Sequence, residues 1–433
     1  MNKKFSIPRG TTDILPSESP VWQDVEMKAR GLLNAYGYKE IRTPIFEETK
    51  LFARSMGDTT DVIQKQMLTL QSQKQSEADD IEAGSLSLRP EGTAAIVRAY
   101  IQNDLDKKES LSKLYYIGPM FRGERPQKGR LRQFHQIGVE ALGPQSSSPY
   151  LDAEVIALSI HILKELGIKD FQLILNTLGT PDDKKALYEL IKSKLKASLS
   201  QLCDDCQNRF NKNVFRILDC KNRSCQQVVK NLDFGYDWLS DESKKYFLKV
   251  QEVLKSLGIK FEVNPSLVRG LDYYTHTVFE IKSVSLGSQD ALGAGGRYNN
   301  LVADLGGGQV DAVGFALGVE RILLAAPPKE GSAENNLDVF LVALDEKSFD
   351  LGFQILNRLR QEKIAGNMSY KISSIKSQMR QADKSAARFV MIIGEEELKK
   401  NTASVKDMTT GEQKEVKIDL SDLSALKNVL RQK

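Results

Sequence analysis

Three polar side chains that could bind a ligand fall on one face of a predicted β-hairpin. Residues 114–143 form two extended segments joined by a basic turn that contains Gly and Pro, and alternate side chains of an extended segment share a face. If the segments pair with these faces together, Arg122, Gln136 and Glu140 line one floor around Gly138. Side chains of these types can bind a ligand through charge and hydrogen bonds. An ordinary solvated face is the alternative, which the more apolar opposite face disfavours.

A second polar group stands in the segment SLRPEGTAAIVRAY. A strand is predicted to end at Arg89-Pro90 and a helix to begin near Thr93, which places Glu91, Gly92 and Thr93 at a helix N-terminus. One interpretation is a routine threonine cap with an acidic residue near the helix dipole. The other is a binding site in which the carboxylate and the hydroxyl hold a ligand.

Two further arginines stand in glycine-containing segments that could bind phosphate. Arg269 begins RGLDYY, where Tyr273 and Tyr274 could supply a pocket wall and a phenolic hydrogen bond. A guanidinium flanked by glycine suits an anionic group at close range. Arg321 lies in GFALGVERILL, residues 314–324, where a small-residue strand turns into a helix. An arginine in a first helical turn is usually solvated, but two spaced glycines before it favour a site for terminal phosphates.

All four cysteines of the chain fall within one short stretch. Their spacings, C-x2-C and C-x4-C, lie within the range of zinc ligands, and the residues are Cys203, Cys206, Cys220 and Cys225. Zinc binding and a role as small core residues both remain open, since no histidine lies nearby in the sequence. The pattern is not that of a disulfide-rich secreted domain.

The composition is that of an ordinary protein of the aqueous phase. The chain has 433 residues, 41% hydrophobic and 27% charged, enough for two or three domains with their own cores. No apolar run approaches the roughly 20 residues that a membrane span needs, and Pro8 and Gly10 interrupt the basic start. We therefore expect no membrane association and a cytoplasmic location. The net charge of +4 is too small to indicate a nucleic-acid partner by itself.

The elements that must position these residues follow from periodicity. A helix is predicted from Pro20 to Tyr36, capped by Ser19, and then a strand from 39 to 43 that stops at Pro44. Residues 71–84 are polar and predict a surface loop. Other predicted elements are a helix over 152–166 and strands over 171–175 and 277–281.

The C-terminal part has the pattern of a separate α/β domain. Residues 326–336 have the composition of a linker, and the segments 337–344, 349–359, 388–393 and 423–430 alternate between strand-like and helix-like patterns. A basic stripe recurs every four residues on a predicted helix, at Lys376, Arg380, Lys384 and Arg388. It is either a solvated face or a surface for an RNA stem.

Several of these segments together resemble a known family. FRGERPQKGRLRQFHQ, within 114–143, resembles motif 2 of the class II aminoacyl-tRNA synthetases in the form found in histidyl-tRNA synthetases. The helix–strand–Pro44 segment resembles motif 1 and residues 314–324 resemble motif 3. RGLDYY followed by TVFE, and GAGGRYNNLV at 293–302, resemble the two signatures peculiar to histidyl enzymes.

The resemblance implies a fold and a domain plan. We expect an α+β catalytic domain with a mostly antiparallel sheet of class II synthetase type, a helical insertion domain, and a C-terminal α/β domain. The expected boundaries are 1–179 and 259–325 for the catalytic core, 180–258 for the insertion domain, 326–336 for the linker and 337–433 for the anticodon-binding domain. Motif 1 implies a homodimer.

The resemblance also implies a reaction. L-Histidine and ATP, with Mg2+, give histidyl-adenylate, and histidine then passes to the terminal adenosine of tRNA(His). Arg122 is expected on the α-phosphate and the substrate carboxylate, Arg269 on the charge that develops at that phosphate, and Arg321 on the pyrophosphate. Glu124 is expected to accept from the adenine amino group. Zinc is not implied by the family.

Histidine recognition is expected from the polar groups of the hairpin and the RGLDYY segment. Glu140 and Tyr274 would bind the two imidazole nitrogens, and a site built for both rejects residues that lack them. The full set expected to contact histidine is Glu91, Gly92, Thr93, Arg122, Gln136, Glu140, Arg269, Tyr273 and Tyr274. The tRNA acceptor end is expected at Arg125, Gln127 and Arg132.

A second class of function shares the catalytic motifs. A non-catalytic, histidine-sensing regulatory subunit of an ATP phosphoribosyltransferase is similar in its core, but such paralogues lack the anticodon domain and lose motif residues. The enzyme hypothesis requires Arg122, Arg269 and Arg321 to meet in one cavity.

Overall fold

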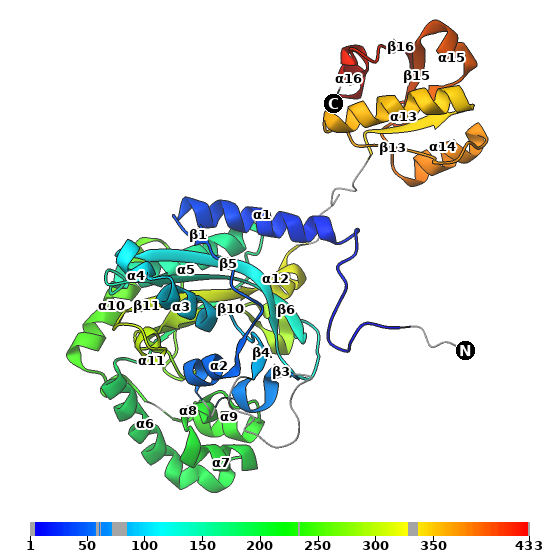
Figure 1. The fold of residues 1–433 in the computed structure, drawn as a ribbon. Coiled ribbons are helices and arrows are strands. Elements are labelled where there is room, and N and C mark those ends of the chain that lie inside the picture. The colour runs from blue at the N-terminus through cyan, green and yellow to red at the C-terminus, as the bar shows by residue number, and fades with distance from the viewer. Residues whose placement is uncertain are drawn as a thin grey trace. The chain divides into compact units, whose positions relative to one another are not determined.

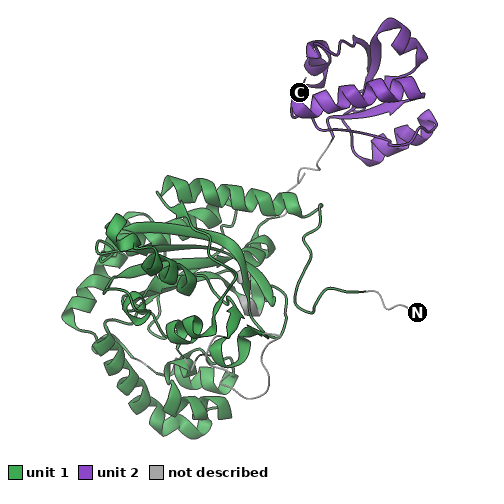
Figure 2. Cartoon of the chain, viewed as in Figure 1, with its two compact units in different colours: residues 1–328 green, residues 329–433 purple. Residues whose placement is uncertain are grey.

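The hairpin expected at 114–143 is present and forms part of a large sheet. Strands β5 (Ser112–Phe121) and β6 (Gln133–Leu142) pair antiparallel. Their register sets Tyr116 opposite Gly138 and Gly118 opposite Gln136, so the polar faces of the two strands coincide as the alternation predicts. In the computed structural model, the described residues are 5–57, 60, 62–71, 85–232, 234–327 and 337–431. The chain divides into two compact units, residues 1–328 and 329–433 (Figure 2).

The sheet of the larger unit has eight strands in the order β1-β5-β6-β11-β10-β9-β7-β8. The β1–β5 and β7–β8 pairs are parallel and the others antiparallel, which matches the mostly antiparallel sheet expected. Its remaining strands are β1 (Lys39–Glu40), β7 (Gln172–Thr177), β8 (Glu262–Val263), β9 (Thr275–Lys282), β10 (Ala291–Arg297) and β11 (Ala312–Gly318).

The two faces of the sheet carry different kinds of side chain. On one face the apolar side chains of Ile137, Val139 and Ala141 are fully buried in a core shared with helix α5 (Pro149–Glu165). Helices α1 (Ser19–Ala35) and α10 (Asp241–Ser256) pack against α5. The opposite face carries the polar side chains of the hairpin. Period-two alternation along β6 therefore separates a packed face from a ligand-facing one.

Smaller elements border the polar face. A three-stranded sheet in the order β2-β4-β3 adjoins the end of β5, where the Phe121 N–H donates to the Arg89 carbonyl (2.9 Å). Gly92, at the start of α3, lies against Tyr116 of β5, and α2 packs against α3 (Figure 1). These elements and the remaining short ones of this part are β2 (Phe46–Glu48), α2 (Thr49–Met56), η1 (Val62–Gln66), β3 (Leu68–Leu70), β4 (Leu86–Leu88), α3 (Thr93–Gln102), α4 (Leu105–Lys108), η3 (Val284–Gln289), α11 (Leu301–Asp304) and α12 (Val319–Ala325).

The described part of 180–258 is mostly helical, as predicted, although its last helix, α10, packs against α5. Helices α6 to α9 gather at one end of the larger unit (Figure 1). Helix α6 starts with a capping box between Thr180 and Asp183, a local signal that stabilises a helix N-terminus. The elements are α6 (Pro181–Leu195), η2 (Lys196–Gln201), α7 (Asp204–Lys212), α8 (Phe215–Leu218) and α9 (Arg223–Lys230).

The smaller unit is an α/β fold with a five-stranded sheet in the order β13-β12-β14-β15-β16. Parallel strands form one side and antiparallel strands the other. The elements are β12 (Val339–Ala343), α13 (Glu346–Gln361), β13 (Gly366–Met368), α14 (Ile375–Lys384), β14 (Phe389–Ile393), α15 (Glu395–Lys400), β15 (Thr402–Asp407), β16 (Gln413–Lys417) and α16 (Ser424–Leu430).

Three local predictions were wrong. Ser19 is the first residue of α1 and not its cap, because its hydroxyl donates to the Leu15 carbonyl (3.0 Å). Strand β1 covers only residues 39–40, with one further hydrogen bond from the Ile41 N–H to the Tyr115 carbonyl (2.8 Å). Arg388 lies beyond α14, which ends at Lys384, and its guanidinium lies over the Phe389 ring.

Two predicted segments, the polar loop and the linker, extend beyond the described residues. Residues 72–84 of the predicted polar loop and 328–336 of the predicted linker lie outside the described residues. Within the part of the chain that the structure describes, no helix combines the length and apolar character needed to cross a membrane.

Candidate active site

The polar face of the hairpin forms the floor of one cavity of about 520 Å³, a size typical of small-molecule sites. Arg122, Arg269 and Arg321 all line it, so the spatial requirement stated above is met. The other predicted residues along its wall are Glu91, Thr93, Glu124, Gln136, Glu140, Tyr273 and Tyr274. Four predicted residues are not part of the described lining, namely Gly92, Arg125, Gln127 and Arg132.

Glu140 marks the end of the cavity that has hydroxyl groups. Its carboxyl accepts hydrogen bonds from the Thr93 hydroxyl (2.7 Å) and from the Tyr298 hydroxyl. Burial raises the pKa of Glu140 to about 8, the two hydrogen bonds oppose that rise, and the neighbouring Glu91 adds to it. This carboxyl therefore changes charge close to neutral pH. We name Thr93, Glu140, Tyr273, Tyr274 and Tyr298 the hydroxyl end.

Glu91 is fixed by the start of helix α3. Its two carboxylate oxygens accept from the backbone N–H groups of Thr93 (2.7 Å) and Ala94 (2.8 Å). Burial raises the pKa of Glu91, and these hydrogen bonds, with the Arg122 charge, partly offset the rise. Glu91 therefore satisfies the first backbone N–H groups of the helix and also lines the cavity. The threonine cap was wrong, because Gly92 precedes the helix and the Thr93 hydroxyl donates to Glu140 instead. The binding role of the segment stays a prediction.

The Tyr116 ring lies between two glycines beneath this end. A Cβ at Gly92 would lie 2.4 Å from Cζ of Tyr116, and one at Gly138 would lie 2.3 Å from the same atom. Both distances are far below van der Waals contact. Glycine is therefore required at both positions to let the ring fill the space between β6 and the start of α3.

The opposite end of the cavity is rich in arginine. The Arg122 Nε donates to the Pro90 carbonyl (2.9 Å), and the Arg321 Nε donates to the Gly129 carbonyl (3.0 Å). The Arg269 Nη1 donates to Glu280 (2.7 Å). Glu124 forms an ion pair with Arg130. We name Arg122, Arg130, Arg269 and Arg321 the arginine end.

The guanidinium groups of the arginine end lie close enough to repel one another. Burial lowers the pKa of Arg122, and the Arg269 charge adds to that effect. Burial also lowers the pKa of Arg321 and of Arg130, and in both cases the Arg122 charge acts in the same direction. Guanidinium groups that repel one another in a partly buried site favour a polyanionic ligand.

Among the described residues, two buried atoms of the cavity wall have neither a hydrogen bond nor an ion pair, whereas Oε2 of Glu124 is paired with Arg130. They are Oε1 of Gln136 and Nε of Arg269. Because buried polar groups are nearly always hydrogen-bonded, such atoms point to a ligand that completes them. One is an acceptor beside the floor glycines and the other is a charged donor, so the ligand must offer both a donor and an anionic acceptor.

Comparison with known proteins agrees with this geometry. The family "Histidyl-tRNA synthetase" matches residues 10–322, and the family "Anticodon binding domain" matches residues 338–425. A histidine–tRNA ligase of Halothermothrix orenii is 47% identical over 411 residues, which are 94% of this chain and 96% of that protein.

The chain belongs to the histidyl-tRNA synthetase family.

Other relatives support the same assignment. A histidine–tRNA ligase of Bacillus subtilis is 44% identical over 420 residues, 96% of this chain and 97% of that protein. The crystal structure of apo S. aureus histidyl-tRNA synthetase is 37% identical, with a TM-score of 0.79 over 99% of this chain and 100% of that one. The family resemblance and the class II fold inferred from the motifs are therefore confirmed.

The histidyl-tRNA synthetase site contains residues that sequence reasoning missed. Tyr298 lies 158 residues from its partner Glu140, although it stands inside the quoted signature GAGGRYNNLV and could have been found there. Tyr116 lies on the predicted polar face of β5 but was given no role. Arg216 and Lys221, from the helical segment 180–258, also line the cavity, and no pattern in the sequence indicated their position.

The arginine of the second signature, Arg297, links two buried elements of the fold. Arg297 is 1% exposed and pairs with the fully buried Asp152 (2.5 Å). Its guanidinium also donates to the Ser146 carbonyl (2.7 Å). It therefore joins β10 to α5 in this histidyl-tRNA synthetase family member.

The motif 2 turn has exposed and anchored residues. Arg125 and Gln127 are exposed, and the turn is closed by paired backbone hydrogen bonds between Gln127 and Arg130. Arg132 is half-buried, and its guanidinium donates to the backbone carbonyls of Glu124 (3.2 Å) and Arg9 (3.4 Å). Two of the three expected RNA contacts are therefore accessible, while the third residue holds the turn.

Proposed function

We propose that this chain is a histidine–tRNA ligase, which activates L-histidine with ATP to histidyl-adenylate and transfers histidine to the 3′-terminal adenosine of tRNA(His). The observation that carries the proposal is the shared cavity, which has a hydroxyl end for an aromatic diazole and an arginine end for a triphosphate. The family assignment and the curated relatives along nearly the whole chain support it.

Histidine would lie across the floor toward Glu140. A neutral imidazole has one donor and one acceptor; Glu140 would take the N–H and the Tyr274 hydroxyl would donate to the other nitrogen. The α-amino group would lie near Glu91, Thr93 and the unpartnered Gln136 Oε1. Burial and the Glu91 charge raise the pKa of Tyr274 to about 12, with the Arg269 charge opposing that rise, so its hydroxyl stays a donor.

ATP would lie along the arginine end. The histidine carboxylate is itself the nucleophile, so no covalent enzyme intermediate is needed. It attacks the α-phosphorus while Arg122 holds both groups and Arg269 stabilises the charge that develops on the phosphate oxygens. Arg321 would hold the departing pyrophosphate. In the second step the terminal hydroxyl of the RNA attacks the adenylate carbonyl and AMP leaves.

The nucleotide base and the metal have candidate partners in the same region. Glu124, buried and paired with Arg130, is the proposed acceptor for the adenine amino group. Magnesium suits the oxygen donors of Glu280 and Glu320, which line the cavity. When bound with ATP, the ion would neutralise phosphate charge.

The remaining partners follow from the domain plan of 180–258 as insertion domain and 337–433 as anticodon-binding domain. Lys376, Arg380 and Lys384 are exposed along α14. Their four-residue spacing places them on one side of the helix, where they could contact the RNA backbone.

A homodimer through motif 1 is supported by the exposed Met27, Ile45 and Phe46 near that motif. Sedimentation equilibrium tests the dimer. The proposed location is the cytoplasm.

One assay tests the function directly. Histidine-dependent exchange of pyrophosphate into ATP is expected, followed by charging of tRNA(His). Histidine binding without exchange would support a regulatory subunit instead. A protein titled as an ATP phosphoribosyltransferase regulatory subunit/histidyl-tRNA synthetase shares the fold at 20% identity and a TM-score of 0.65, but the matched anticodon-binding domain and the four motif residues Arg122, Glu124, Arg269 and Arg321 favour the ligase.

A further inference from the structure

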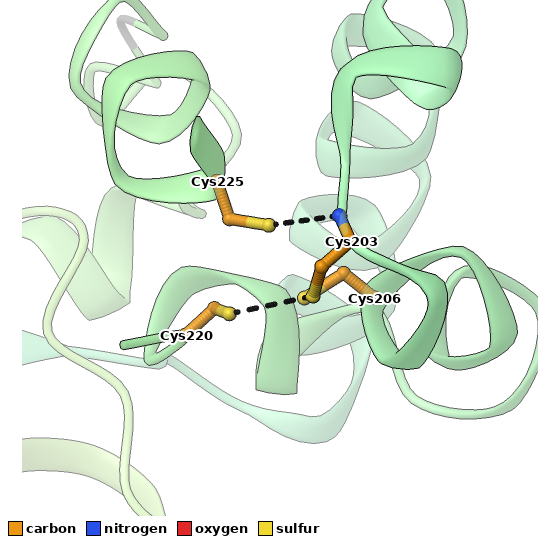
Figure 3. A group of neighbouring side chains, drawn as sticks. All are labelled: Cys203, Cys206, Cys220 and Cys225. Carbon is orange, nitrogen blue, oxygen red and sulfur yellow. Dashed lines mark hydrogen bonds between the residues drawn. The ribbon is translucent and has the colours of Figure 1, made fainter. Parts of the chain in front are cut away.

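The four cysteines converge on one point, although they come from three separate places in the chain. Cys203 precedes α7 and Cys206 lies in its first turn, while Cys220 follows α8 and Cys225 lies in α9. Their sulfur atoms all lie within 4.8 Å of one another, and the Sγ atoms of Cys203 and Cys220 are 3.9 Å apart (Figure 3). We name these residues the cysteine cluster.

This geometry matches a tetrahedral metal site. Four Zn–S bonds of about 2.3 Å place the sulfurs roughly 3.8 Å apart, so the cysteine cluster needs to contract by at most about 1 Å to enclose zinc. Softer sulfur ligands in a tetrahedral set select zinc over magnesium or calcium. The spacings C-x2-C and C-x4-C lie close to those of known zinc sites.

The surroundings of the sulfurs also suit thiolate ligands. The backbone N–H of Cys203 donates to Sγ of Cys225 (3.2 Å; Figure 3), and that of Asn222 donates to Sγ of Cys220 (3.4 Å). Hydrogen bonds of this kind orient metal ligands and stabilise their charge. Cys206 and Cys225 are fully buried. Core residues that only filled space would have no reason to direct all four sulfurs to one point.

The cysteine cluster lies directly behind one wall of the active site. The segment 213–221, which contains Cys220, contributes Arg216, Leu218, Asp219 and Lys221 to the cavity lining. Asp219 and Lys221 flank Cys220 in the sequence. A metal that fixed Cys220 would therefore fix the backbone that presents both charged residues to the ligand.

The same segment is docked on the loop that carries Arg269 and Tyr273. The Arg216 guanidinium donates to the Gly270 carbonyl (3.4 Å), and the Asn213 amide donates to the Asp272 carboxylate (3.1 Å). These contacts connect the region of the cysteine cluster to the wall of the proposed histidine and ATP sites.

We propose that Cys203, Cys206, Cys220 and Cys225 bind one structural zinc ion that holds residues 213–221 against the loop 269–274, so that zinc loading tightens substrate binding. The zinc site itself stands on the sulfur geometry alone. Its effect on substrate binding rests on the proposed ligase function.

The first test measures the metal without reference to activity. The full chain purified without chelator is expected to contain one zinc per chain by mass spectrometry of the metal. Cobalt(II) added to chelated protein is expected to give the sulfur-to-metal charge-transfer bands of a tetrahedral thiolate site. A zinc content near zero that incubation with zinc does not raise would overturn the proposal. A protein mass lower by four hydrogens would also overturn it, since that result means two disulfides.

The second test uses variants and the exchange reaction. Cys220→Ser is expected to lose zinc, and Gln226→Ala, an exposed neighbour on α9, is expected to keep it. Chelated wild-type protein is expected to show a rise in KM for histidine and ATP of about tenfold, comparable to the loss of one or two hydrogen bonds across the wall. Added zinc is expected to return both KM values to those of the untreated protein.

If Cys220→Ser does not fold, the chelated and reloaded wild-type protein still gives the comparison. Zinc bound with exchange unaffected by its removal would overturn the coupling, whereas zinc bound with no exchange under any condition would overturn the ligase function and leave the metal site intact.

Discussion

The two ends of the active-site cavity are held in opposite ways. At the hydroxyl end, Thr93, Glu140 and Tyr298 satisfy one another with hydrogen bonds. At the arginine end, Arg122 and Arg321 are held by backbone carbonyls, while Arg269 and Arg130 pair with Glu280 and Glu124. The Arg122 charge nevertheless repels those of Arg321 and Arg130. The first end can exchange its own hydrogen bonds for those of a neutral ring, and the second gains only when an anion arrives. The difference supports the proposal that amino-acid selectivity depends on the first end and stabilisation of developing charge on the second.

The largest effect is expected at the arginine end. Arg269→Ala should reduce kcat for histidine-dependent pyrophosphate exchange by about 10²–10³-fold, the usual loss when one donor to transition-state charge is removed. Arg54→Ala, an exposed arginine of α2, serves as the matched control and should leave the rate unchanged. Circular dichroism should show that both variants are folded. Near-normal exchange by a folded Arg269→Ala protein would refute the role.

A smaller and more selective effect is expected at the hydroxyl end. Glu140→Gln keeps the shape of the side chain but cannot ionise, so it lacks the charge-assisted acceptor that the carboxyl becomes on losing its proton, and KM for histidine should rise by about 10–100-fold. KM for ATP should change far less. Steady-state exchange with each substrate varied in turn measures both constants, and equal changes in the two would count against contact between Glu140 and the imidazole ring.

The same variant should change how stability depends on pH. Because the pKa of Glu140 is about 8 in the folded chain, against an ordinary value of 4.5, the folded state keeps a proton that the unfolded state loses between those values. Wild-type stability should therefore fall as pH rises through this window, relative to Glu140→Gln, by up to about 1.4 kcal/mol per pH unit. Thermal unfolding of both proteins from pH 5 to pH 9, followed by tyrosine absorbance, measures the difference. A constant difference across the range would show that the carboxyl is not perturbed.

The smallest effect is expected from Tyr298→Phe. Only the hydrogen bond to Glu140 is lost, so KM for histidine should rise by about fivefold, equivalent to about 1 kcal/mol. The pKa of Glu140 should rise further, because that hydrogen bond lowers it. Tyr236→Phe, whose hydroxyl donates to Asn176 outside the cavity lining, is the control. A kcat loss with unchanged KM would place Tyr298 in the chemical step instead.

The sequence predicted those parts of the site that depend on local geometry. Alternation along β6 was enough to group Gln136 with Glu140, since period two holds wherever a strand forms. The motifs then supplied Arg269 and Arg321. Tyr298 meeting Glu140, and Arg216 reaching the cavity wall, depend on packing between distant segments, which residue spacing does not encode. The end of α14 before Arg388 was missed because a four-residue repeat continues past the helix that it suggests.

The Tyr116 ring between Gly92 and Gly138 limits how this pocket can be re-engineered. A library of single substitutions at either glycine is expected to give no variant with a new specificity, because any added side chain overlaps the ring. Directed evolution toward a different amino acid would have to change two positions at once, for example Gly138→Ala together with Tyr116→Leu. A new amino-acid specificity therefore requires a simultaneous substitution of Tyr116 and of the glycine next to it.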